Sequence, residues 1–235
     1  MVKSLRYWLE VTDVIRLENK GHKTTEFGEA ILNNDPGGTA KITKGLLHYH
    51  LTSDKFKSQA PGFNYFVYNF DEELFTQETL VSGLIKTFPM VSENTIKRDS
   101  NCILSLYTRN IRNNPEDKNV SILGDFPFVR FLGNNTYEKV RNGSNQINKN
   151  LIYFAIRSST DELVINIDDL TNGKNSPLKT FNISKASLFE IIEQLSADKK
   201  YPMNIDRTSG IGTISFTNKK NRNLYEEVYN LEMGK

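Results

Sequence analysis

The sequence lacks the features that mark several classes of protein. Cys102 is the only cysteine among 235 residues, so the chain can form no internal disulfide and no thiolate cluster for zinc. No apolar run approaches the roughly 18 residues of a membrane span, and the first residues lack the apolar core of a signal peptide. These absences predict a soluble, cytoplasmic protein without a membrane partner.

Signatures of common small-molecule enzymes are also missing. The sequence contains no glycine-rich phosphate loop, no G-x-S-x-G nucleophile elbow and no H-E-x-x-H zinc motif. The net charge is only +2, so composition by itself gives little support to a polyanionic partner. Support for nucleic-acid binding must therefore come from the positions of the basic residues.

The start of the chain alternates short helical and strand-like patterns. Val2 to Leu9 places its apolar residues on one helical stripe, and Asp13 to Leu17 is typical of a short strand. The polar stretch Glu18 to Thr25 predicts a turn or wing, after which a second helix runs to about Ile31. A helix followed by a short hairpin is the second half of a winged helix-turn-helix unit, so we expect a partial unit over residues 1–58.

The middle of the chain repeats this pattern more completely. Thr76 can cap a helix over about Gln77 to Thr87, and Ser92 can cap a second helix after a short turn. The stretch Arg109 to Lys118 and the strand-like Phe126 to Phe131 then provide a wing. Residues 59–145 are therefore predicted to form a second winged-helix-like unit.

The helix that begins at Ser92 carries the strongest local signal for DNA binding. Its predicted apolar stripe consists of Ile96, Ile103 and Leu106. The other side carries side chains suited to phosphates and base edges, namely Asn94, Lys97, Arg98, Asn101 and Ser105. The alternative is an ordinary solvated face, with Arg98 and Asp99 in surface ion pairs. Lys3 and Arg6 on the first helix are the next candidates for DNA contact.

The last third, residues 146–235, predicts a C-terminal α+β unit. A helix over Asn148 to Arg157 precedes the alternating strand Glu162 to Ile167, and Ser184 caps an amphipathic helix. A hairpin and a final helix over about Leu224 to Leu231 follow. The best candidate for the preceding boundary is Asn142 to Asn148.

Few residues suit catalysis or metal binding. Asp35, His48 and His50 form the only grouping of a carboxylate with imidazoles, the side chains that hold a metal ion and polarise water in phosphodiester cleavage. The two histidines share a side only if their segment is a strand. Structural roles are the alternative for both histidines, and a turn or helix stop for Asp35. The acidic pairs Asp168-Asp169 and Glu116-Asp117 are better explained as caps or turn formers.

Several short sequence blocks stand in a distinctive order and spacing through most of the chain. The blocks are Met1 to Leu9, Phe27-Gly28, Asp35-Pro36, Leu46 to Tyr49, Val91 to Asp99, Asn101-Cys102 and Asp206 to Ile211. Together they resemble the SspB-like family, a domain-of-unknown-function family of bacterial DNA phosphorothioation systems. The chain departs from the family in two ways: additional helices usually precede the first block, and acidic residues usually occupy the interval that is Gly37 to Gly45 here.

The resemblance implies engagement of double-stranded DNA alongside a cysteine desulfurase, an ATPase and an enzyme related to PAPS reductases. It also implies DNA nicking. For a metal-dependent nickase, with Mg²⁺ or Mn²⁺ as cofactor, Asp35 and His48 are the catalytic candidates that the residues themselves offer. If the acidic residues of the family hold a metal ion, their absence over Gly37 to Gly45 argues against cleavage by this chain. A non-catalytic DNA-binding adaptor and a transcriptional regulator are the alternatives. With the preceding helices absent, we expect the aromatic stretch Phe63 to Phe75 to cover Leu5, Trp8 and Leu9. Self-association of the chain through this face is the alternative.

Overall fold

The computed structural model describes residues 2–19, 21–54, 59–108, 121–173, 176–208 and 211–234, apart from the side chains of Val2, Lys3, Arg207, Thr208 and Ile211. The architecture is α+β, with helices and small antiparallel sheets, as the sequence predicts. Among the described residues, no helix is long and apolar enough to cross a membrane.

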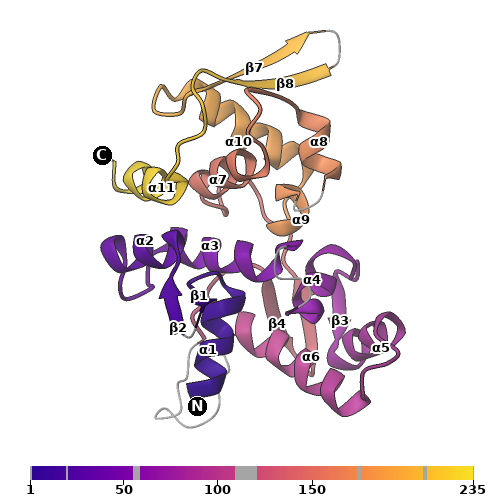
Figure 1. Cartoon of the computed structure of the whole chain (residues 1–235). Helices are drawn as coiled ribbons and strands as arrows, with labels where there is room; N and C mark the ends of the chain where they lie inside the picture. Colours follow the sequence, from indigo (N-terminus) through magenta and orange to yellow (C-terminus); the bar gives the residue numbers. More distant parts are fainter. Residues whose placement is uncertain are drawn as a thin grey trace.

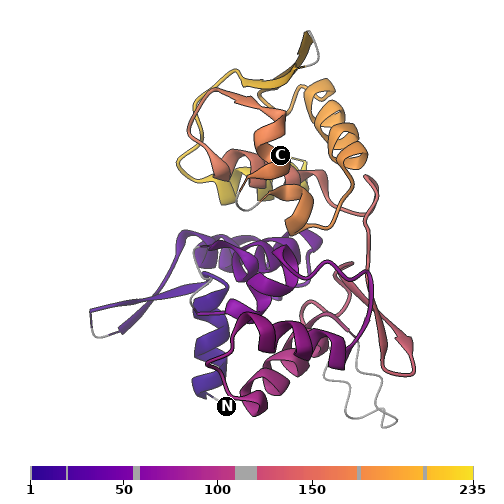
Figure 2. The same cartoon turned by 90° about the vertical axis from the view of Figure 1, so that its right-hand side faces the viewer.

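The first part of the chain consists of three helices and one hairpin. These elements are α1 (Val2–Val11), β1 (Ile15–Glu18), β2 (Gly21–Thr24), α2 (Glu26–Asn34) and α3 (Lys41–Thr52). The stretch Glu18 to Thr25, predicted to be a turn or wing, contains strand β2, which pairs with β1 in a hairpin that extends away from the other elements (Figure 2). Both strands are largely exposed.

The middle part follows the order helix, strand, two helices and two strands. Its elements are α4 (Pro61–Tyr68), β3 (Leu74–Thr76), α5 (Gln77–Thr87), α6 (Glu93–Tyr107), β4 (Val129–Gly133) and β5 (Thr136–Lys139). The last strand lies in the centre of the sheet, in the order β3-β5-β4. Helices α5 and α6 match the prediction, whereas the predicted wing at Arg109 to Lys118 lies outside the described residues.

The last part repeats this order, with one short helix added before the helix Lys185–Ala197 and one further helix added at the end. Its elements are α7 (Lys149–Ser159), β6 (Val164–Asn166), α8 (Ile167–Asn172), α9 (Pro177–Thr180), α10 (Lys185–Ala197), β7 (Met203–Thr208), β8 (Ile211–Phe216) and α11 (Leu224–Met233). The sheet order is β6-β8-β7, again with the last strand in the centre. The hairpin and the capped helix α10 match the prediction. The division into three units stays a prediction.

Helix α3 of the first part lies at the boundary where the first two parts meet the last part (Figure 1). Ten of its residues are buried, including His48 and His50, because α4 packs on it from one part and α7 from the other. Its Gly45 permits this approach, since a Cβ there would lie 2.1 Å from Cδ1 of Leu151 on α7. The buried side chains of all parts form one continuous core.

Helix α1 packs partly as expected from the sequence. The Trp8 ring meets the Phe63 ring edge-on, with centroids 5.7 Å apart, so an aromatic residue of α4 does cover it. Leu5 remains 60% exposed. It lines an apolar groove of about 290 Å³ together with Trp8, Leu47 and Leu106. The described residues therefore cover the apolar side of α1 only in part: Trp8 packs against Phe63, and Leu5 stays exposed.

Candidate functional site

Helix α6 presents the polar face that the sequence predicts. Ser92 caps the helix by accepting a hydrogen bond from the Thr95 backbone N–H at 3.3 Å. Ile96 and Ile103 are buried against α4, α5 and β4, and Leu106 is half-buried. The residues predicted to contact DNA are all exposed: Asn94, Lys97, Arg98, Asn101 and Ser105. The exposure of these residues and the burial of Ile96 and Ile103 are therefore confirmed.

The charges on this face are only partly neutralised within the chain. Lys97 Nζ lies 2.6 Å from Glu93 Oε1, one turn earlier, and both side chains are more than half exposed. Such an exposed pair is weak, so Lys97 can exchange this partner for a phosphate. Arg98 forms no ion pair with any other side chain that the structure describes. The Asn101 side-chain oxygen accepts a hydrogen bond from Gln77 Nε2 at 2.9 Å, which holds it at the start of α5.

The remaining cationic candidates lie on α1. Arg6 is exposed. The Lys3 side chain lies outside the described residues. Helix α1 lies beside α6, since Leu5 of α1 and Leu106 of α6 line the same apolar groove.

Helix α10 occupies the position in the last part that α6 occupies in the middle part. Its exposed charged residues are Lys185, Glu190 and Glu193, two of which are acidic. Lys185 lies 3.1 Å from Asp168 in an exposed pair. The surface of α10 is thus less suited to a polyanion than that of α6.

A second exposed element is the β4–β5 hairpin, whose first strand overlaps the predicted strand Phe126 to Phe131 and whose second strand the sequence analysis missed. The rings of Phe75, Tyr137 and Phe131 lie side by side across the sheet, with centroids 5.8 and 5.1 Å apart, and Phe131 at the outer end is 51% exposed. The turn contains Gly133, Asn134 and Asn135, all with positive φ. The dipeptide Asn134-Asn135 between alternating residues was the available sequence signal, because asparagine tolerates this conformation.

Asp35 joins two helices. It is the C-cap residue of α2, and its carboxylate accepts hydrogen bonds from the backbone N–H groups of Thr39 at 3.1 Å and Ala40 at 2.9 Å, just before α3. Burial acts to raise the pKa of Asp35, but hydrogen bonds from Thr43, Ala40 and Thr39 outweigh it and lower that pKa. These contacts give Asp35 a structural role, the alternative that the sequence left open.

His48 lies in the interior. It is fully buried, and its Nδ1 is 2.7 Å from the Tyr107 hydroxyl while its Nε2 is 2.6 Å from the Thr180 carbonyl oxygen. Because the carbonyl can only accept, Nε2 donates and Nδ1 accepts from Tyr107. Burial lowers the pKa of His48 to about 4, so the ring is neutral at physiological pH. A catalytic role for Asp35 or His48 stays a prediction.

His50 points to other partners, as expected on a helix. Its Nε2 lies 3.0 Å from the Tyr225 hydroxyl of α11. Within the described part of the chain, no three His, Cys, Asp or Glu side chains gather into a group that could hold a metal ion. Asp168 and Asp169 lie in the first turn of α8, and Glu116-Asp117 is outside the described residues.

Comparisons with known proteins agree with this architecture. A crystal structure of SspB matches with a TM-score of 0.83 and 20% identity, and a magnesium ion-bound crystal structure of SspB matches with a TM-score of 0.82 and 19% identity. Each match covers 99% of this chain and 75% of that chain. At this identity the likeness shows the fold. A search among curated proteins finds no match.

A family model matches almost the entire sequence. It covers residues 1–230 and carries the description protein of unknown function (DUF4007). The sequence blocks quoted above and the fold of SspB point to the same group. This chain is therefore a member of the DUF4007 family.

Proposed function

We propose that this chain binds double-stranded DNA through the exposed face of α6, as the DNA-binding component of a phosphorothioation or related defence system. The observation that carries the proposal is the outward face of α6, which combines Asn94, Lys97, Arg98 and Asn101 on the exposed side of a capped helix. The system is inferred from the resemblance of the sequence blocks, and the likeness to SspB agrees with it.

The surrounding elements suit this role. The order α4, β3, α5, α6, β4 and β5, with a sheet in which the last strand is central, supports our assignment of a winged helix in which α6 is the recognition helix. In that arrangement the start of the recognition helix enters the major groove and the hairpin contacts the neighbouring backbone. Arg130 of β4, which is 59% exposed, would then lie on the wing.

Counterion release predicts how much the loss of Lys97 and Arg98 should change the salt dependence of DNA binding. Each phosphate neutralised by a cation contributes a slope of about 0.9 to the dependence of log affinity on log salt concentration. Replacing Lys97 and Arg98 by glutamine should therefore reduce the slope by roughly 2 and weaken binding several-fold or more at moderate salt. Fluorescence anisotropy of a labelled duplex, measured at several salt concentrations, tests this expectation.

The matched control replaces Lys199 and Lys200 by glutamine. These adjacent lysines are also exposed, but they lie between α10 and β7, far from α6 (Figure 1). The control should bind duplex DNA like the original protein. Equal affinity and slope in the original protein and the α6 variant would place the DNA interface on another surface.

This function can take two forms. The enzymatic form is a metal-dependent nickase, and the non-enzymatic form is an adaptor or transcriptional regulator that binds DNA without cutting it. The resemblance favours the nickase, whereas the described residues present no metal cluster. Incubation of supercoiled plasmid with Mg²⁺ or Mn²⁺ separates them, because only a nickase produces relaxed circles. Loss of relaxation in Asp35→Asn, with duplex binding and thermal midpoint retained, would support catalysis at Asp35.

A further inference from the structure

We infer that a cavity between α3 and α7 binds one nucleoside monophosphate unit. The cavity has a volume of about 270 Å³. This lies just below the roughly 300–1,000 Å³ of typical small-molecule sites, so it suits a ligand of one nucleotide rather than a larger cofactor. It is separate from α6, because no residue of that helix lines it.

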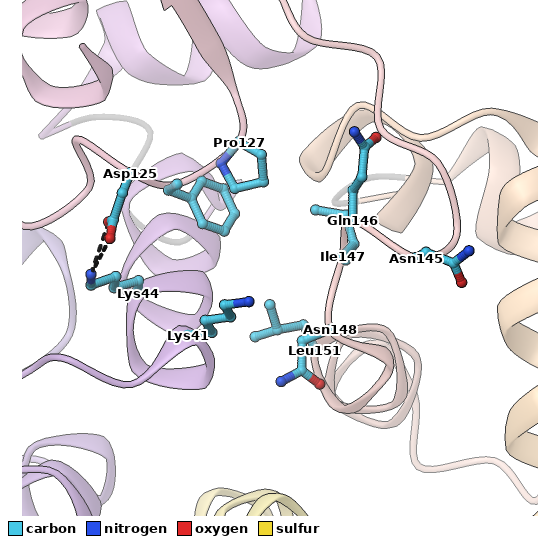
Figure 3. A pocket seen from close by; sticks show the side chains of 10 residues that line it. Lys41, Lys44, Asp125, Pro127, Asn145, Gln146, Ile147, Asn148 and Leu151 are labelled. Atoms are coloured by element: carbon cyan, nitrogen blue, oxygen red, sulfur yellow. Dashed lines mark hydrogen bonds and ion pairs between the residues drawn. The ribbon is translucent and has the colours of Figure 1, made fainter. Parts of the chain in front are cut away.

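One wall of the cavity carries positive charge. Lys41 and Lys44 project from the first turn of α3, and Lys44 Nζ lies 2.8 Å from each carboxylate oxygen of Asp125. Lys41 has no hydrogen bond or ion pair with any side chain that the structure describes. Figure 3 shows its amino group pointing away from α3 toward Leu151 and Asn148 on the opposite side. The lysines exceed the lining carboxylate by one charge, so an anionic group is favoured.

The other walls suit a planar ring and polar edges. Phe126 is 6% exposed, and its ring packs on that of His48 with centroids 4.7 Å apart, so it forms a fixed apolar surface. Leu151 contributes a second buried apolar surface. The amides of Asn145, Gln146 and Asn148 line the rim, and that of Asn145 is exposed.

These groups together indicate the chemistry of the ligand. The free Lys41 ammonium pairs with a phosphate, the Phe126 and Leu151 walls take an apolar ring, and a carboxamide bonds to the polar edge of a base. A nucleoside monophosphate carries all three features. Its source is either a free nucleotide or one nucleotide of a DNA strand, and only the second source rests on the proposed DNA-binding function.

The test titrates the full chain with a free deoxynucleoside monophosphate, with inorganic phosphate and with a short single-stranded oligonucleotide, using isothermal titration calorimetry. Lys41→Gln should weaken nucleotide binding by about tenfold, because it removes a charge-assisted contact. Asn145→Asp should also weaken it, because it places a carboxylate on the exposed rim. Lys199→Gln is the matched control and should leave it unchanged.

The outcomes separate the two sources. Binding of the free nucleotide that Lys41→Gln weakens by about tenfold assigns a free ligand, whereas an effect of Lys41→Gln on the oligonucleotide alone assigns a DNA nucleotide. Phosphate binding as tight as nucleotide binding, or no response to either variant, overturns the inference. Duplex binding through α6, measured on the same variants, reports separately on the proposed function, and an unchanged thermal midpoint shows that the variants are folded.

Discussion

His48 links three helices through its two ring nitrogens. Tyr107 on α6 donates to it, and it donates to the carbonyl of Thr180 on α9. Tyr68 of α4 extends this network, since its hydroxyl lies 2.6 Å from Thr180 Oγ1. The network stabilises the folded chain only while the imidazole is neutral, because a protonated ring could no longer accept at Nδ1.

This state of His48 predicts a loss of stability in mild acid. The unfolded chain binds the proton near pH 6.5, whereas burial lowers the pKa in the folded chain to about 4. Between these values the unfolded chain binds more protons, so the stability present above pH 6.5 falls as pH decreases toward 4. The contribution amounts to roughly 3 kcal/mol of unfolding free energy. Urea unfolding at pH 7 and pH 4.5 should show it.

The matched variant for this experiment is His48→Gln. Glutamine has no proton to gain in this range, so its unfolding free energy should change less between the two pH values. At pH 7 the variant should be less stable than the original protein, because the two hydrogen bonds lose their geometry. An equal pH dependence in both proteins would show that another group is responsible.

At the scale of elements, a buried lysine of β5 satisfies the carbonyl groups at the end of α4. Lys139 donates from Nζ to the carbonyl oxygens of Phe66 at 2.8 Å and Phe70 at 2.6 Å. Because the helix stops here, no following turn offers N–H groups to these carbonyls. Burial lowers the pKa of Lys139 to about 8. The contact ties the central strand of the middle sheet to the helix that packs on α6.

Replacing Lys139 by methionine should therefore destabilise the middle part. The side chain keeps its length, but buried carbonyls lose their donor at a cost of about 1–3 kcal/mol. Lys179→Met is the matched control, because Lys179 donates to the Tyr68 carbonyl at 3.1 Å from an exposed position and should cost less than about 1 kcal/mol. Similar losses in the two variants, measured by thermal unfolding, would contradict a special role for the buried amine.

At the scale of the whole molecule, the parts meet where α3 crosses α7. Any side chain at position 45 would overlap Leu151, which is 2% exposed and cannot move into solvent. Gly45→Ala should destabilise the chain by about 1–3 kcal/mol through overpacking, although alanine is the better helix former by about 1 kcal/mol. Gly21→Ala is the control, because a Cβ there meets nothing within 4 Å.

A double-mutant cycle tests whether the overlap is the cause. Leu151→Ala by itself should cost about 2–5 kcal/mol, since it leaves a cavity in the shared core. In the presence of this change, Gly45→Ala should cost little, because the new methyl group enters the space left by leucine. Strictly additive losses in unfolding free energy would show that α3 and α7 do not meet as described.

The sequence by itself determined the elements whose signals are local. Ser92, Thr76 and Ser184 each cap the predicted helix with an accepting side chain, because capping depends only on residues three positions away. The exposed face of α6 could be predicted for the same reason. Ile96 and Ile103 recur at the helical period, so they share one side of the helix, and that side is buried. The absence of a disulfide also required nothing beyond the count of cysteines.

Tertiary structure alone decided what depends on residues far apart in the chain. His48 has partners 59 and 132 positions away, so no local pattern could distinguish a core histidine from a catalytic one. Strands β3 and β5 are too short to show a period and exist because they pair with each other. The cavity beside Lys41 arises where α3 meets the start of α7. Its walls come from segments about a hundred residues apart, which only the packed core brings together.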